Sequence, residues 1–560
     1  MTTRRDHFDR RLAALKLEAE QWRPHWKELS DNIKPRSSRF FTTDRQAQGN
    51  LRNTKIFDNT ATIAVRTLES GMMSGITSPA RPWLVFKTSD PVVNEIQSVK
   101  WWLETVRTRI LETFLKSNIY TTLPECYSSL GVYGTGAFLL LEDAKTVLRA
   151  QSLPIGSYML GTDYAGRVDT CYREYQMTAA QLVNQFGKDA VSSAVLSNYS
   201  TGNADAWVDV VHAIEPNTDW DEQKLEAKYK KYVSVYYEKG SKQHEFLRIS
   251  GYDEFPVIAP RWEVTGEDIY GSSPAMVALG DIKALQLEQK RKAQALDKMV
   301  TPPMKGPTSM RGKRVSLLSG DITYVDETAN GQKLEPAVAV NVSFSELLED
   351  IHENQERIKR AFYADLFLLI ASDERSNVTA YEIAQRKEEK LMALGPVYLR
   401  LNDELLDPLV ERAFHILNRA GLLPPPPMEM QGLDLTIEYI SVMAQTMKAI
   451  GIASIERVAQ FAGTIANAFP DVLDRLNADR AFVHYADMAG APSDVIYDDK
   501  AVEAARRKKA QMQQAQQAMA VAQQGAETAK TLSETQLSDN NALAQLAQRF
   551  QAAPPVVGAQ

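Results

Sequence analysis

The chain has 560 residues, a mass of 62.6 kDa and a formal net charge of −7, and its hydrophobic and charged fractions are 44% and 24%. This size implies several subdomains, because a single hydrophobic core stops growing at about 250–300 residues. The acidic balance argues against a protein that grips nucleic acid tightly, since such proteins gain affinity from many Lys and Arg contacts to phosphates.

Disulfide-rich and membrane-spanning classes are also excluded. Cys126 and Cys171 lie far apart, so the sequence indicates neither a disulfide framework nor a thiolate metal site, and it fits a reducing cytoplasm. The N-terminus lacks the apolar core of a secretory signal, and no segment approaches the roughly 18 uninterrupted apolar residues of a membrane span. We expect a protein without a membrane segment.

Residues 1–133 are predicted to be mainly helical. Apolar residues recur every three or four positions from 4 to 34, and Pro24 is expected to kink or divide this helix. The segment from Ile56 to Thr60 is predicted to lead into a second helix that ends in the region from Gly71 to Gly75. An extended segment at 82–86 and helices at 93–120 and 122–133 are predicted to follow.

From 137 to 263 the pattern changes to short apolar runs separated by turn residues, which is typical of strands. The runs cover 137–141, 157–160, 208–214, 231–237 and 255–259. One helix is predicted near 178–196. The fold class is therefore α+β and mainly helical.

Two long amphipathic helices, 274–300 and 345–370, flank a basic insert at 301–343 that is punctuated by Pro and Gly. Ser273 and Pro274 supply the cap and the first-turn proline of the first helix. At about 1.5 Å per residue each helix is about 40 Å long, so we predict an antiparallel pair with the insert at one end.

The remainder of the chain is predicted to be helical as well. A long helix covers 379–418, with a kink at Pro396, and ends before Gly421. A small helical unit is predicted at 433–488. The Ala/Gln-rich stretch 500–548 has strong helix propensity but too few large apolar residues to be buried by itself.

No catalytic constellation is found in the sequence. The P-loop string is absent, and Gly131, Gly134 and Gly136 stand in helix-to-strand order, the reverse of what a dinucleotide site requires. His352-Glu353 lacks the second histidine of a zinc-binding helix. We therefore expect no enzymatic activity, no cofactor and no metal.

Clustered charges are the remaining candidates for function. The basic clusters are Lys290, Arg291 and Lys292 on the first long helix, and Arg311, Lys313 and Arg314 in the insert. They either face DNA or form a solvated face or an intersubunit salt bridge. The acidic cluster consists of Glu346, Glu349, Asp350, Glu353 and Glu356. Their spacing places these carboxylates on one side of the second helix, where they need cations from the same subunit or from another.

Several segments match a known pattern in their number and order. They are Arg10-Arg11-Leu12 to Trp26, Ile56-Phe57-Asp58-Asn59-Thr60-Ala61, Gly71 to Trp83, Gly131 to Gly136, Tyr270 to Ala275, Phe362 to Phe367, Thr379 to Ile383, Gly395-Pro396, and Glu404 to Leu409. With these segments the chain resembles the head-to-tail connecting, or portal, proteins of short-tailed bacteriophages, up to about residue 490.

The resemblance implies the phage portal fold, with a wing, a stem helix pair, a clip, a crown and a C-terminal helical barrel. The implied segments are 1–270 (wing), 271–300 (first stem helix), 301–343 (clip), 344–370 (second stem helix), 371–377 (tunnel loop), 378–432 (wing or backbone helix), 433–495 (crown) and 496–560 (barrel and disordered tail). In the loop, the residues implied to touch the duplex are Ser372, Asp373, Glu374, Arg375, Ser376 and Asn377. The implied docking residues of the clip are Lys305, Arg311, Lys313 and Arg314.

The resemblance also implies a homo-oligomeric ring, usually of twelve subunits, at one vertex of the capsid. Double-stranded DNA would be pumped through the bore by a terminase motor and would leave through it during infection. Further implied partners are tail adaptor or nozzle proteins and the major capsid, scaffolding and internal core proteins. The location would be the virion, after assembly in the host bacterial cytoplasm.

Two other functions remain open. The first is a non-portal helical scaffold or a tail adaptor of a virion, and the second is a DNA-processing enzyme. A ring whose central hole admits a duplex distinguishes the portal from both.

Overall fold

The computed structural model describes residues 4–35, 37, 39–40, 54–94, 96–305, 335–336, 344–371, 394–441, 443–444, 458–466, 469, 477–489 and 502–516. The chain divides into two compact units, Met1–Ala453 and Ser454–Gln560. The first unit combines helices and sheets, which agrees with the predicted mixture of the two.

The helices of the first unit are α1 (Arg4–Asn32), α2 (Thr60–Gly75), α3 (Pro91–Asn94), α4 (Gln97–Lys116), α5 (Ile119–Tyr133), α6 (Ala179–Phe186), α7 (Ser193–Ser200), α8 (Pro274–Val300), α9 (Phe344–Ala361), α10 (Ala364–Ala371) and α12 (Asp407–Arg419). Residues 394–401 are also helical and lead through a π-helix, Asn402–Leu406, into α12. Short 3-10 turns lie at Ala227–Tyr229 and Met428–Met430.

The strands are β1 (Leu84–Thr88), β2 (Phe138–Asp143), β3 (Val147–Ser152), β4 (Tyr158–Thr162), β5 (Val168–Thr178), β6 (Trp207–Pro216), β7 (Tyr232–Glu238), β8 (Arg248–Tyr252), β9 (Val257–Ile258), β10 (Met304–Lys305), β11 (Glu335–Pro336) and β12 (Leu435–Tyr439). They form an antiparallel sheet in the order β4-β5-β6-β7-β8, a sheet in the order β3-β2-β9, and the pairs β1-β12 and β10-β11.

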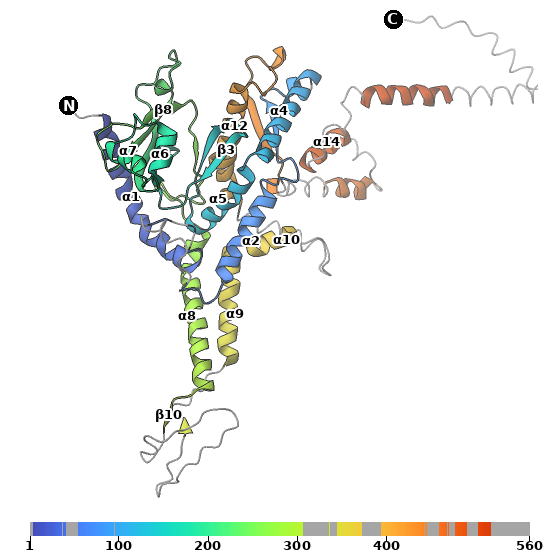
Figure 1. Ribbon diagram of the computed structural model, residues 1–560. Helices are drawn as coiled ribbons and strands as arrows, with labels where there is room; N and C mark the ends of the chain where they lie inside the picture. Colours follow the sequence, from blue (N-terminus) through green and yellow to red (C-terminus); the bar gives the residue numbers. More distant parts are fainter. Residues whose placement is uncertain are drawn as a thin grey trace, which may run out of the picture. The chain divides into compact units, whose positions relative to one another are not determined.

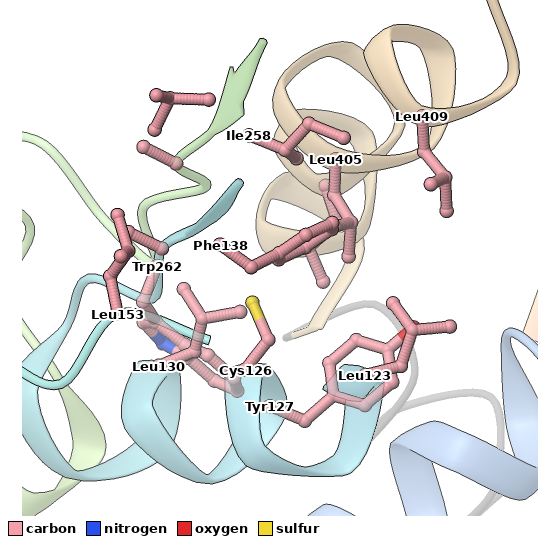
Figure 2. Close-up of a cluster of buried hydrophobic side chains, with 14 of the residues drawn as sticks. Leu123, Cys126, Tyr127, Leu130, Phe138, Leu153, Ile258, Trp262, Leu405 and Leu409 are labelled. Carbon is pink, nitrogen blue, oxygen red and sulfur yellow. The ribbon is translucent and has the colours of Figure 1, made fainter. Parts of the chain in front are cut away.

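The core of the first unit lies where α5 meets the three-stranded sheet and the π-helix (Figure 2). Leu123, Cys126, Tyr127 and Leu130 line one face of α5 at the spacing of successive helical turns. They pack with residues from distant parts of the chain, among them Phe138, Ile258, Trp262, Leu405 and Leu409. Both Cys126 and Cys171 are buried free thiols, and burial raises their pKa values.

Three predictions in the N-terminal part need correction. Pro24 does not divide α1, which is one helix. The single helix predicted near 178–196 is two helices, because α6 stops at Gly187 (φ 90°) and Ser192 caps α7 anew. Instead of one helix over 93–120, α3 and α4 are separate, and the side chain of Asn118 bonds the backbone N–H and C=O of Ala150 just after α4 ends.

The second long helix is interrupted, which corrects the prediction of one helix over 345–370. α9 stops at Ala361, Tyr363 takes the left-handed conformation (φ 55°), and α10 starts at Ala364. The interruption turns the chain so that α10 packs on α2, where Phe367 lies against Gly71. A side chain at Gly71 would overlap the Phe367 ring, so this crossing requires glycine.

The segment predicted as a helical unit at 433–488 begins with a strand. β12 pairs antiparallel with β1, with Tyr439 opposite Leu84, and the Tyr439 ring stacks on Trp83 at 6.3 Å between centroids. The alternation in Leu435–Tyr439 suits a strand, and the pairing connects segments that are about 350 residues apart.

In the second unit the described residues are almost all helical. α14 (Ala478–Ala489) is joined to the helical residues 502–516 by two hydrogen bonds from Arg506 to the Asp479 carboxylate, at 2.7 and 2.6 Å. Residues 502–516 begin the predicted Ala/Gln-rich helix, and the rest of that stretch lies outside the described residues.

Candidate functional site

The helical hairpin α8–α9 is the feature that the rest of the first unit positions. Figure 1 shows the two helices side by side, leading away from the strand-rich part of the unit to β10. α8 has the predicted bounds, because Ser273 caps it and Pro274 occupies its first turn. The Ser273 Oγ accepts from the Met276 N–H at 3.1 Å and donates to the Val132 carbonyl at 2.8 Å, which fixes the start of α8 to the end of α5.

Next to this cap, the segment that contains Gly134 contacts the segment that contains Gly271. Gly134 is left-handed (φ 74°), and a Cβ there would overlap the backbone of Gly271. The Gly271 N–H donates to the Thr135 hydroxyl at 2.9 Å, and the Trp262 N–H donates to the Gly134 carbonyl at 2.8 Å. The two backbones therefore touch, and this contact sets where α8 begins.

The part of the hairpin nearest the sheets is held by an apolar seam. Ile282 and Leu285 of α8 and Ile351 and Ile358 of α9 are buried. Beside the seam, the Asn354 amide donates to the Glu288 carboxylate at 2.9 Å. This pair fixes the antiparallel register of the two helices.

A polar cluster around Asp58, which precedes α2, binds both helices of the hairpin. Its carboxylate accepts hydrogen bonds from Gln289 of α8 (3.0 Å) and Gln355 of α9 (2.8 Å). Gln286 completes the cluster, since its Oε1 accepts from the N–H groups of Phe57 and Asp58 and its Nε2 donates to the Asp58 carbonyl. We call Asp58, Gln286, Gln289 and Gln355 the hairpin clasp.

Ionisation of Asp58 strengthens the clasp. Burial opposes the charged form, but hydrogen bonds from Thr60, Gln355 and Gln289 outweigh it and hold the pKa of Asp58 below its usual value. A carboxyl whose pKa is lower in the folded than in the unfolded chain stabilises the fold above its unfolded pKa of about 3.9. That contribution is lost as the pH falls through the lower, folded value.

We expect Asp58→Ala to lower the free energy of unfolding by about 2 kcal/mol at neutral pH, because it removes two side-chain hydrogen bonds to a charged acceptor. The difference from the unchanged protein should be full at pH 6 and should shrink below about pH 4. Denaturant unfolding at several pH values, followed by circular dichroism, measures the loss of stability and its dependence on pH. Asp281→Ala is the matched control, since its exposed pair with Arg357 is 3.6 Å long and should contribute below about 1 kcal/mol. Equal losses in the two variants would contradict the clasp.

The predicted stem residues lie on the half of the hairpin beyond the clasp. Lys290 and Arg291 of α8 are exposed and Lys292 is half-buried. On α9, Glu346, Glu349, Asp350 and Glu353 are all exposed. The structure brings the two sets onto one hairpin but does not join them, because Lys290 lies over the Phe57 ring at 5.8 Å and Glu353 pairs with Arg357 of its own helix.

The predicted docking and loop residues are largely beyond the described part of the chain. Lys305 is exposed in β10, directly after α8, where it stands opposite Glu335 of β11. Arg311, Lys313 and Arg314 fall outside the described residues. The same is true of Ser372, Asp373, Glu374, Arg375, Ser376 and Asn377.

Sequence reasoning missed the hairpin clasp and a second anchor, the pair of Arg261 and Glu404. Asp58 and Gln286 gave partial signals, because Asp58 lies in a segment that carried the resemblance and Gln286 falls on the buried face of α8. Arg261 and Glu404 are 143 positions apart, so no local pattern connects them.

The buried histidine of the five-stranded sheet serves the fold. His212, which is fully buried in the five-stranded sheet, has both ring nitrogens occupied by Arg173 (3.1 Å) and Ser234 (2.9 Å). Burial, with the nearby cations Arg173 and Arg248, holds its pKa well below the usual value.

Among the residues that the structure describes, no group of three or more His, Cys, Asp or Glu side chains could hold a metal ion. Of the described helices, none combines the length and apolarity required to span a bilayer.

Comparison with known proteins gives the same segments a family context. A family described as "Bacteriophage head to tail connecting protein" matches residues 5–496. The portal protein of Salmonella phage epsilon15 is 47% identical over 546 residues, which cover 97% of this chain and 98% of the relative. The probable portal protein of Bordetella phage BPP-1 is 45% identical over 540 residues, covering 96% and 97% respectively.

One solved structure has a weaker likeness. A chain from the neck of an empty GTA particle, determined with C6 symmetry, is 11% identical and has a TM-score of 0.35, with 78% of this chain and 90% of that chain covered. A score this low does not establish a shared fold.

Proposed function

This chain belongs to the family of bacteriophage head-to-tail connecting proteins and is a phage portal protein, and from that premise we propose how its parts form the portal. Portal proteins are structural components of the virion at the capsid vertex. The α8–α9 hairpins of about twelve copies surround a bore through which double-stranded DNA is packaged and ejected.

The observation that supports this proposal most is the hairpin and its attachment. Two helices that leave a mixed wing unit side by side, fixed by the Ser273 cap and the hairpin clasp, give each copy a rigid strut. Beyond the clasp the strut has little core of its own, and Leu287, Leu296 and Leu348 are 47%, 44% and 47% exposed. Apolar side chains at such exposure are stabilised when neighbouring copies cover them.

We assign the remaining segments on the same premise. Residues 1–270 form the wing, 301–343 the clip and 371–377 the tunnel loop, while 433–495 form the crown and 496–560 the C-terminal barrel. The strand pairing of β12 with β1 supports one change, namely that residues 435–439 work as part of the wing. The clip, with Lys305, Arg311, Lys313 and Arg314, docks the terminase motor and afterwards the tail adaptor.

The mechanism is passive and has no enzymatic step. A conduit must keep DNA on its axis without binding it, and a net charge of −7 repeated around a ring repels phosphates from every side. Lys and Arg residues limit that repulsion, and residues 372–377 touch the duplex through its backbone and shape. The outer surface meets the major capsid, scaffolding and internal core proteins.

Mass measurement and negative-stain imaging of the purified assembly test the proposal. We expect closed rings, predominantly of twelve copies, with a central hole that admits a DNA duplex. A rod, or a chain that stays monomeric at high concentration, would favour the alternative of a helical scaffold or tail adaptor. A ring too narrow for a duplex in every state would contradict the conduit.

A further inference from the structure

The outer face of α8, which is the flank about a quarter turn away from the side that contacts α9 through Glu288 and Asp281, is basic. Arg291 follows the buried Ile282 by nine residues, or about two and a half turns, so it points to the opposite side of the helix. Lys298 follows seven residues later on the same side. Residues 287–300 contain four Lys or Arg residues and two carboxylates, which gives this half of the helix a net charge of +2.

The outer face of α9 is acidic. Glu349 and Glu353 flank the buried Ile351 at two residues on either side, so both point away from α8. Residues 345–356 contain five carboxylates and no Lys or Arg. The two outward faces of one hairpin therefore carry opposite charge.

Within one copy these faces do not neutralise each other. The two helices meet through their apolar seam, and the ion pair that the structure places between them, Arg357–Asp281, lies nearer the sheets. Arg291, Lys292 and Lys298 make no ion pair in the described part of the chain, and neither do Glu346, Glu349 and Asp350. Opposite charges on two different faces are the arrangement expected of a head-to-tail contact between identical copies, the kind that closes a ring.

We propose that the basic outer face of α8 docks on the acidic outer face of α9 of the next copy. This inference rests on the proposed ring. The contacts between α8 and α9 show which residues of the two helices lie at the same height along the hairpin, because Glu288 lies beside Asn354 and Asp281 beside Arg357. Arg291 is then within about one turn of the height of Glu349, so adjacent upright hairpins place these two residues opposite each other.

The shape of the α8 face suits this partner. Gly280 and Ala284 lie along the same side as Arg291, and a Cβ at Gly280 would meet nothing within 4 Å. Small residues there allow a neighbouring helix to come close. Exposed Leu287 of α8 and Leu348 of α9 add apolar area next to the charged pairs. The contact therefore combines apolar burial with charge complementarity, which fixes its register.

Charge reversal of one predicted pair tests the proposal. Arg291→Glu and Glu349→Lys should each raise the protein concentration needed for half-maximal ring assembly about tenfold or more, since each places like charges against each other. The double variant, Arg291→Glu with Glu349→Lys, should restore assembly close to that of the unchanged protein. Mass photometry over a concentration series at low salt gives the ring fraction.

Controls separate this inference from the proposed function. Lys145→Glu, in the exposed turn between β2 and β3, makes the same change of net charge as Arg291→Glu and should leave assembly unchanged. If the unchanged protein forms no rings, the proposed function fails. If it forms rings and both reversals leave assembly intact, only the docking of these faces is overturned. The docking of these faces is also overturned if Glu349→Lys leaves ring assembly intact and impairs only DNA packaging, because the acidic face would then line the bore.

A disulfide provides a second measurement that does not depend on charge. Arg291→Cys and Glu349→Cys lie on different helices, more than about 10 Å apart within one copy and beyond the roughly 7 Å that a disulfide allows between Cα atoms, so a bond between them requires two copies. Oxidised rings should give a ladder of linked chains in denaturing electrophoresis, and either single variant should not. The native Cys126 and Cys171 are buried and do not interfere. Absence of a ladder in rings of the double-cysteine protein would overturn the predicted register.

Discussion

Gly134→Ala is expected to lower the free energy of unfolding by about 3–4 kcal/mol. Part of the loss, about 1 kcal/mol, comes from placing a side chain in the left-handed conformation, because Gly134 has a φ of 74°. The larger part comes from overlap of the new Cβ with the backbone of Gly271 and Ser272, which cannot move without shifting the start of α8. Denaturant unfolding followed by circular dichroism measures the change.

Gly202→Ala is the matched control for this prediction. Gly202 has a similar φ of 83°, but a Cβ there would meet nothing within 4 Å, so only the conformational part of the loss should remain. The difference between the two variants isolates the close backbone approach that positions α8. Similar losses would show that the two backbones can separate at little cost.

Arg261→Ala should be about as damaging, with a loss of about 3–5 kcal/mol. The Arg261 side chain is 5% exposed and donates to both oxygens of Glu404, from Nε at 3.1 Å and Nη2 at 2.7 Å. The Arg261 backbone N–H donates to the same carboxylate at 2.8 Å. Removing the guanidinium leaves a largely buried charge without its main partner, and this accounts for the size of the effect.

Two further variants sharpen this second prediction. Replacing both partners, as Arg261→Met with Glu404→Leu, should be less destabilising than Arg261→Ala alone, because no buried charge is then left unpaired. Arg357→Ala removes the exposed ion pairs to Glu353 and Asp281 and should cost below about 1 kcal/mol. A double variant at least as unstable as the single one would show that packing around Arg261, and not its charge, maintains this contact.

Elements with strong local signals were predicted correctly from the sequence. The bounds of α8 were predicted because Ser273, Pro274 and the apolar period all act within the helix itself. The strands between 137 and 263 were recognised by alternation, although β3, β5 and β8 were not among the predicted runs. The family assignment also followed from short segments whose number and order were informative.

The errors arose where distant contacts override local preference. Residues 345–370 have a continuous helical period, yet the chain turns at Tyr363 so that Phe362 and Phe367 can both be buried. Leu435–Tyr439 becomes a strand because β1 offers an edge for pairing. The charged residues of α8 and α9 were named from the sequence, and their role in the site stays a prediction. The hairpin clasp and the Arg261–Glu404 pair were missed, since their members come from distant parts of the chain.

The sequence by itself determined that two helices form a hairpin, that strands occur between 137 and 263, which charge each hairpin helix carries, and which family the chain belongs to. Each of these properties depends on residues that are neighbours in the sequence or on the order of short segments. Only the tertiary structure decided how the hairpin is held and which charges point outward. Hydrogen bonds and close backbone crossings depend on positions accurate to a fraction of an ångström between segments more than a hundred residues apart, and no local pattern carries that information.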